Sequence, residues 1–240
     1  MKAASKPDGQ RAKRPPLRRV LGCVSLVARG TLLLSDVVLL LTVLQVASVR
    51  TINPPFTATQ VSRAWSVGAW PDRQWRSLDA LGPVPSAMIS AEDQSFWTHS
   101  GFDWKAIKDA IAHNREHPES RRGGSTITQQ VARNVFLWQG GGYVRKGLEA
   151  YYTVLLEALV PKERILELYV NVAETGPDCF GAEAGSKRWF KRSAKDLTAE
   201  QASTLAAILP SPRKWTPSDR GVQKRARWIR AHPAPAKKGQ

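Results

Sequence analysis

The 240-residue chain has little cysteine and little negative charge. Its two cysteines, Cys23 and Cys179, lie in segments of different character, so a disulfide between them is not expected. No set of Cys and His residues has metal-ligand spacing, which excludes a structural zinc module. Lys and Arg number 36 against 20 Asp and Glu, a formal net charge of +16. This charge favours polyanionic partners such as nucleic acid, anionic lipid head groups or a phosphate-bearing substrate, although a solvated basic surface would look the same.

Alternating strand patterns, internal repeats and a Walker phosphate-binding loop are also missing. Apolar residues instead recur at helical spacing, which predicts a mainly α-helical fold. The expected helices cover residues 86–95, with a serine N-cap, and 104–113, 126–136, 145–159, 162–172, 181–190 and 199–209, with a short one at 222–231.

Long apolar runs are confined to the N-terminal part, where residues 31–49 are almost wholly apolar. As a helix they would span about 28 Å, close to the roughly 30 Å of a bilayer core. The basic residues before them predict a cytoplasmic tail at 1–19 and a single transmembrane anchor at 20–50, with the remainder exported. A cleavable signal peptide is the alternative, but residues 46–49 match a cleavage site poorly. Asp36 interrupts the run, seven residues from Arg29 on the same helical face.

Residues 51–82 form a juxtamembrane segment that starts with Asn53-Pro54-Pro55. Trp65, Trp70 and Trp75 alternate there with arginines, a composition that suits either a membrane interface or ordinary core packing. Residues 83–215 hold the candidate catalytic domain, and 216–240 a C-terminal helix and basic tail.

Three motifs in the candidate domain carry reactive side chains. Residues 92–101 read E-D-x-x-F-x-x-H-x-G, residues 123–130 read G-G-S-T-I-x-Q-Q, and residues 145–149 read R-K-x-x-E. Aromatic neighbours would desolvate Glu92 and raise its pKa toward that of a general base, whereas its spacing alone also suits a surface glutamate. The second motif precedes a helix and could offer backbone N–H groups to an anion, or Ser125 or Thr126 could simply cap that helix. Taken alone, the third would give surface ion pairs of about 0.2–0.5 kcal/mol.

Together and in this order, the motifs resemble the peptidoglycan glycosyltransferases over about residues 83–212. The resemblance implies a lysozyme-like helical domain behind an N-terminal transmembrane helix. It also implies polymerisation of the lipid-linked disaccharide-pentapeptide (lipid II) into β-1,4 glycan, by inversion in one displacement, with release of undecaprenyl diphosphate. Such activity serves cell-wall biogenesis and cell shape. Bifunctional members add a transpeptidase domain; residues 211–214 match S-x-x-K, but no S-x-N or K-T-G follows, so the chain resembles the monofunctional biosynthetic type.

By resemblance, Glu92 is the catalytic base and Glu149 a second, auxiliary catalytic carboxylate that orients cations or a metal. The substrate-binding positions are Asp93, Phe96, His99, Gly124, Ser125, Thr126, Gln129, Gln130, Arg133, Arg145 and Lys146. From the residues themselves, Asp93 and His99 are expected to hold local geometry, Phe96 to anchor the loop in the core, and Gln129 and Gln130 to lie on an exposed helix face. Arg133 stands where the family often has lysine, and Asp109 where it often has a basic residue.

No protein metal site and no organic cofactor are predicted, although a divalent cation, Mg²⁺ or Mn²⁺, could accompany the substrate diphosphate. The expected partners are lipid II, the growing glycan strand, the membrane and other cell-wall synthesis proteins, without nucleic acid. The expected location is the bacterial inner membrane, with the catalytic domain periplasmic. Two alternatives stay open: a lytic muramidase with Glu92 as general acid, and a non-enzymatic basic scaffold tethered to the membrane.

Overall fold

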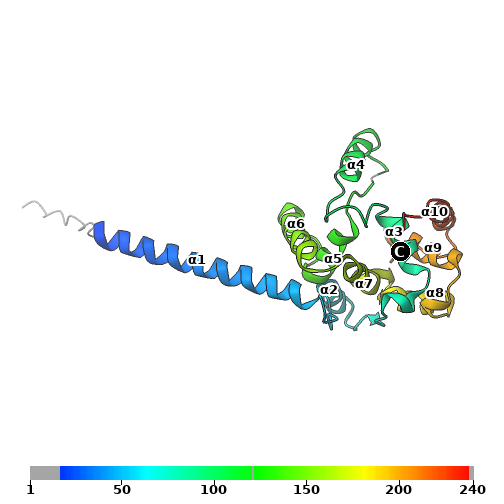
Figure 1. Cartoon of the computed structure of the whole chain (residues 1–240), viewed down its shortest axis with the longest axis horizontal. Coiled ribbons are helices and arrows are strands. Elements are labelled where there is room, and N and C mark those ends of the chain that lie inside the picture. The colour runs from blue at the N-terminus through cyan, green and yellow to red at the C-terminus, as the bar shows by residue number, and fades with distance from the viewer. Residues whose placement is uncertain (1–16, 121, 238–240) are drawn as a thin grey trace, which may run out of the picture. The chain divides into compact units, whose positions relative to one another are not determined.

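The computed structural model describes residues 17–120 and 122–237, so most of the predicted N-terminal tail and the last three residues lie outside the described part. The described residues form ten α-helices, two short 3-10 helices and three short strands (Figure 1). Their bounds are α1 Leu17–Ser48, α2 Ala58–Val67, β1 Asp72–Arg73, η1 Leu78–Leu81, α3 Val84–Glu92, α4 Trp104–Glu116, α5 Ile127–Phe136, α6 Gly142–Leu159, α7 Lys162–Val172, β2 Glu174–Gly176, β3 Cys179–Phe180, α8 Ala182–Phe190, η2 Ala194–Asp196, α9 Ala199–Ile208 and α10 Arg220–Ala231. The predicted mainly α-helical fold is confirmed.

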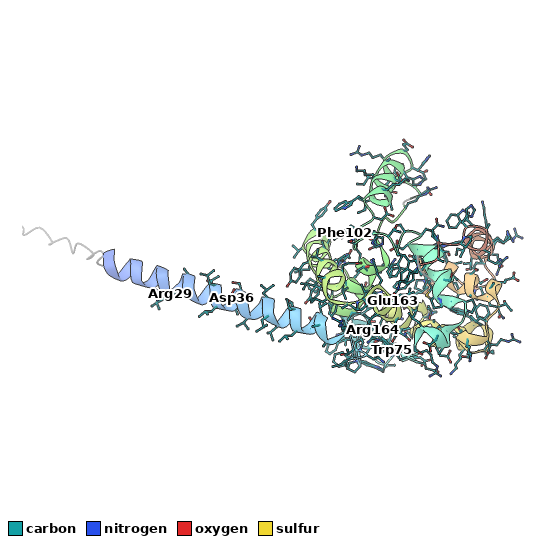
Figure 2. The ribbon with its side chains drawn as sticks, viewed as in Figure 1. Arg29, Asp36, Trp75, Phe102, Glu163 and Arg164 are labelled. Carbon is teal, nitrogen blue, oxygen red and sulfur yellow. The ribbon has the colours of Figure 1, made fainter. Side chains whose placement is uncertain are left out.

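The chain divides into two units, residues 1–45 and 46–240. Helix α1, which begins in the first unit, starts at Leu17, well before the predicted apolar run at residues 31–49. Its stretch Ala28–Ser48 has a mean hydropathy of 2.0 and is long and apolar enough to cross a membrane. Arg29 and Asp36 both lie on this helix (Figure 2), and within the described residues no ion pair joins them.

The second unit is built around α3, α5, α7 and α9. Residues 202–208 of α9 are all buried, and several are small, among them Ala202, Ala206 and Ala207, so α3 and α10 approach this helix closely. On the other side, α5 packs against both α6 and α7. In contrast, α4 stands apart from the other helices (Figure 1) and buries only Ala110. The helices that carry the three motifs thus share one core, and α4 borders it.

A small three-stranded sheet was not predicted. Its order is β1-β3-β2, with β1 parallel and β2 antiparallel to β3. Strands of two or three residues are too short to show an alternating pattern in sequence, which explains why the prediction missed them. The sheet joins the segment before η1 to the turn between α7 and α8, so residues 51–82 pack as part of the second unit.

The three tryptophans of residues 51–82 have different surroundings. Trp75 packs against the core, its Nε1 donates to Glu167 at 3.2 Å, and the guanidinium of Arg164 lies 5.3 Å from its ring centre. Figure 2 shows Trp75 and Arg164 close together. Trp65 and Trp70 are 92% and 61% exposed. Core packing therefore accounts for Trp75, and the membrane-interface interpretation stays a prediction for the other two.

Gly181 gives a direct test of this packing. Its φ is +87°, and a Cβ atom there would lie 2.8 Å from the carbonyl oxygen of Asn171. We expect Gly181→Ala to cost at least about 1–3 kcal/mol from the backbone strain alone, or roughly 2–4 °C of melting temperature per kcal/mol. Gly147→Ala is the matched control, because a Cβ at that helical position meets nothing within 4 Å. Thermal unfolding followed by circular dichroism measures both, and equal melting temperatures would contradict the proposed clash.

Candidate active site

Glu92 is the last residue of α3, so the helix ends three residues before its predicted end. The N-terminus also differs from the prediction: the cap is Pro83, with a second proline in the first turn, rather than a serine. Proline suits a first turn because its missing N–H would have no partner there. The early end leaves the motif residues after Glu92 in turns, from which their side chains reach neighbouring helices.

The carboxylate of Glu92 is held from two sides. Its Oε2 accepts a hydrogen bond from Gln130 Nε2 on α5, and its Oε1 accepts one from a guanidinium nitrogen of Arg225 on α10, both at 3.0 Å. The side chain is only 15% exposed. Burial raises the pKa of the carboxyl above its usual value, and the Gln130 hydrogen bond and the charges of Arg225 and Arg133 oppose it less strongly. The predicted rise in the pKa of Glu92 is therefore confirmed.

Asp93 and His99 fix the loop after Glu92. His99 Nε2 lies 2.9 Å from Asp93 Oδ2, and the same oxygen accepts a 2.9 Å hydrogen bond from the backbone N–H of Ile127. The backbone N–H of Gly101 donates to His99 Nδ1 at 3.0 Å. Because Nδ1 accepts that bond, the ring proton is on Nε2 and points to Asp93. Both side chains are buried and hold the local geometry, as the sequence indicated.

Phe96 has no exposed surface. Its ring centre lies 4.8 Å from that of Trp97 and 6.2 Å from that of His99, in edge-to-face arrangements. A side chain without accessible surface serves as a core anchor, which is the role that the residues themselves indicated for Phe96, and its assignment to substrate binding stays a prediction.

Residues of the second motif cap α5 and line the cavities beside Glu92. Thr126 caps α5: its hydroxyl accepts from the backbone N–H of Gln129, and the Gln129 side chain accepts from the backbone N–H of Thr126. Both side chains are buried, so the expected exposed position of Gln129 is wrong, because the reciprocal cap turns this side chain inward. Only Gln130 reaches Glu92. The Thr126 hydroxyl also donates to the carbonyl oxygen of Gly101 at 2.7 Å, which joins the first motif to the second.

Gly124 and Ser125 line the cavities beside Glu92. A Cβ at Gly124 would lie 3.1 Å from the Cα of Ile107, so glycine allows this loop to approach α4. Ser125 faces the third motif, because Lys146 Nζ lies 3.3 Å from its hydroxyl oxygen.

The third motif surrounds a buried carboxylate. Glu149 on α6 is 1% exposed, Arg145 donates to its Oε2 at 3.0 Å, and Lys146 pairs with its Oε1. The interpretation of this cluster as weak surface ion pairs is therefore excluded, because its carboxylate is buried. Since both of its oxygens already bind cations, Glu149 fits the role of holding Arg145 and Lys146 and does not fit that of a metal ligand. A divalent cation bound with the diphosphate stays a prediction.

Two cavities of about 950 and 1040 Å³ meet at Glu92. They share five lining residues: Ala91, Glu92, Gly123, Ser125 and Trp228. The larger cavity also contains Arg133, whose guanidinium has no hydrogen bond or ion pair with any described residue. The smaller one runs along α4, where Asp109 already pairs with Lys105 at 2.7 Å. A desolvated carboxylate can accept a proton, and a cation nearby can stabilise an anion that leaves.

Arg225 was missed by the sequence analysis. The helix at 222–231 was expected, and it forms as α10. Its buried residues Val222, Ala226 and Ile229 follow helical spacing, and Arg225 borders this stripe. A cation beside an apolar stripe indicates partial burial, but nothing in the local sequence identifies Glu92, 133 positions away, as its partner.

Comparison with known proteins bears on this geometry. A family model described as Transglycosylase matches residues 59–232. The biosynthetic peptidoglycan transglycosylase of Xanthomonas axonopodis pv. citri is 47% identical over 196 residues, covering 78% of this chain and 79% of that protein. Its counterpart in Pseudomonas aeruginosa is 49% identical over 198 residues, covering 78% and 84%. That of Xanthomonas oryzae pv. oryzae is 43% identical over 231 residues, covering 92% and 91%.

Proposed function

The chain belongs to the transglycosylase family and is a glycosyltransferase of peptidoglycan synthesis with a lysozyme-like domain, and from this premise we propose that it polymerises lipid II at the cavities around Glu92. The observation that carries the proposal is the position of this carboxylate: nearly buried, at the junction of two cavities, and near Arg133, which forms no ion pair with any residue that the structure describes. Each feature suits one part of a glycosyl transfer to a sugar hydroxyl.

In the proposed reaction, Glu92 takes the proton from the acceptor sugar hydroxyl as that oxygen attacks the anomeric carbon of the donor. The bond between that carbon and the lipid diphosphate breaks, and its electrons leave with undecaprenyl diphosphate. A single displacement on an α-linked donor gives the β-1,4 link. A raised pKa suits Glu92 as the base, because proton transfer is most efficient when the base titrates near the working pH.

Cations around the cavities would stabilise the departing diphosphate. Arg133 lines the larger cavity without a hydrogen bond to another described side chain, and Lys146 contacts Ser125 at the cavity wall while it pairs with Glu149. Positive groups fixed in a partly dehydrated cleft stabilise developing negative charge without reorganising during the reaction. An uncharged glycosidic bond that is only hydrolysed has no use for such a group, so the cations favour polymerisation over the lytic alternative.

We propose that Ala28–Ser48 anchors the enzyme in the bacterial inner membrane, with the N-terminus cytoplasmic and the catalytic unit periplasmic. The length and apolarity of this stretch support an anchor, and the basic residues before it support this orientation. An anchor would keep the active site at the surface that carries its lipid-linked substrate and so raise the effective substrate concentration. The mass of the mature membrane protein tests this: loss of the N-terminal residues would indicate a cleaved signal peptide instead.

The decisive experiment gives the purified full-length enzyme two substrates separately, labelled lipid II and finished peptidoglycan. The proposal expects lipid II to be consumed and a glycan to form that a muramidase digests. Degradation of finished peptidoglycan without consumption of lipid II would instead show a lytic enzyme. If neither substrate changes while the protein binds the membrane, the scaffold alternative is supported.

A further inference from the structure

The C-terminal helix α10 brings a cation to the carboxylate of Glu92. Val222, Ala226 and Ile229 fix the helix on α9 through fully buried side chains. This packing directs Arg225 toward the end of α3. A guanidinium nitrogen of Arg225 donates to Glu92 Oε1 at 3.0 Å and to the carbonyl oxygen of Ala91 at 2.9 Å. One side chain thus binds both the reactive group and the backbone that carries it.

The chain after α10 fastens the same region a second time. The backbone N–H of Ala234 donates to the hydroxyl of Ser90 at 2.8 Å, and Gln94 donates to the carbonyl oxygen of His232 at 3.2 Å. These contacts lie on either side of Glu92 in sequence. They set the distance between α10 and the end of α3, so the Arg225–Glu92 pair is preorganised before any substrate binds.

Three ionisable side chains interact with Glu92 from the elements around it: Arg225 of α10, Arg133 of α5 and Tyr169 of α7; Asp93 follows it directly in the chain. Burial raises the pKa of Tyr169 well above its usual value, so this phenol stays neutral. Asp93 is already bound to His99. Arg133 acts on Glu92 through space, without a hydrogen bond among the described residues. Arg225 is therefore the cation in direct contact with the carboxylate.

We propose that Arg225 is a positioning residue for glycosyl transfer: it holds Glu92 in a fixed orientation and keeps it in the ionised form that can accept a proton. This proposal rests on the proposed role of Glu92 as the base. It makes α10 part of the active site, although the three motifs lie elsewhere in the chain. The remaining contact, from Gln130, supplies orientation without charge.

The pH dependence separates this role from a merely structural one. An adjacent cation lowers the pKa of a carboxyl by about 1–3 units. Because a base works only when ionised, kcat/KM rises with pH as Glu92 loses its proton. Removing the cation should shift this ascending limb of the pH profile to higher pH. A shift of one unit lowers the rate about tenfold on that limb and leaves the high-pH plateau much less affected. A structural defect alone would lower the rate at every pH and leave the limb in place.

The test compares Arg225→Gln, Arg225→Met and Arg225→Lys of the full-length enzyme, with Arg227→Gln as the control because Arg227 is exposed on the same helix. Activity on labelled lipid II is measured across pH, and folding is checked by circular dichroism. We expect the ascending limb of the pH profile to shift to higher pH by about one unit or more in the Gln and Met variants. In the Lys variant it should lie close to its wild-type position. The Met variant keeps an apolar stem of similar length, so it decides the matter should the Gln variant fail to fold.

The proposal would be overturned if the Gln and Met variants fold and the ascending limb of their pH profile stays at its wild-type position. This holds whether their activity is unchanged or falls equally at every pH. Glu92→Gln, assayed in parallel, separates this failure from failure of the proposed function. If Glu92→Gln keeps its activity, Glu92 is not the base. If Glu92→Gln is inactive and the limb does not move, only the role of Arg225 is contradicted.

Discussion

Glu92→Gln is expected to lower kcat for glycan polymerisation by about 10²–10⁴-fold, the usual contribution of a positioned general base. Glutamine keeps the shape of the side chain and can still accept from Arg225, but it cannot take a proton from the acceptor hydroxyl. Single-turnover measurements with labelled lipid II would separate this loss from substrate binding, which should change little. A variant that keeps more than a tenth of wild-type turnover would show that another group removes the proton.

Stability provides the internal control for this variant. The folded-state pKa of Glu92 is raised above its unfolded value, so the native state favours the protonated carboxyl. Any stability this group contributes is present at low pH and is lost as the pH rises through its folded pKa. Near neutral pH, Glu92→Gln should therefore not melt below the wild type. Glu200→Gln is the matched control, because that carboxylate is 67% exposed and its one ion pair with a described residue is with Arg230, at 3.6 Å; the activity of this variant should be unchanged.

The sequence predicted those features whose cause is local. Apolar spacing gave the helices from α3 to α10 to within a few residues, and aromatic neighbours indicated the burial of Glu92. The distinction between Gln129 and Gln130 was also a local matter, but it was read incorrectly. Thr126 and Gln129 form a T-x-x-Q capping box, which turns one glutamine into the helix end and leaves the next to face Glu92.

Other features arise only from long-range packing. Helix α2 was not predicted, although Thr57 and Gln60 form the same kind of local capping box, and residues 51–82 were assigned only as a juxtamembrane segment. Strand β1 pairs with β3, about a hundred residues later in the chain, and all three strands are too short to leave a pattern. The contact of Arg225 with Glu92 depends on how α10 lies on α9 and α3. No single stretch of sequence contains that information.

Glu149→Gln should lower the melting temperature, whereas Glu92→Gln should not, although the chemical change is the same. Glu149 is buried between Arg145 and Lys146, so removing its charge leaves two neighbouring cations without their shared partner. Breaking a buried ion pair in this way costs up to about 3–5 kcal/mol, which corresponds to a melting temperature lower by roughly 2–4 °C for each kcal/mol. Mutual repulsion would also move Lys146 away from Ser125, and we expect kcat/KM to fall on the order of 10²-fold from the loss of charge-assisted contacts to the diphosphate. Calorimetry and polymerisation assays on the two Glu→Gln variants in one buffer measure both effects. A lower melting temperature with full activity at a temperature where the variant is folded would limit Glu149 to a structural role, and no change in either would contradict its part in holding the two cations.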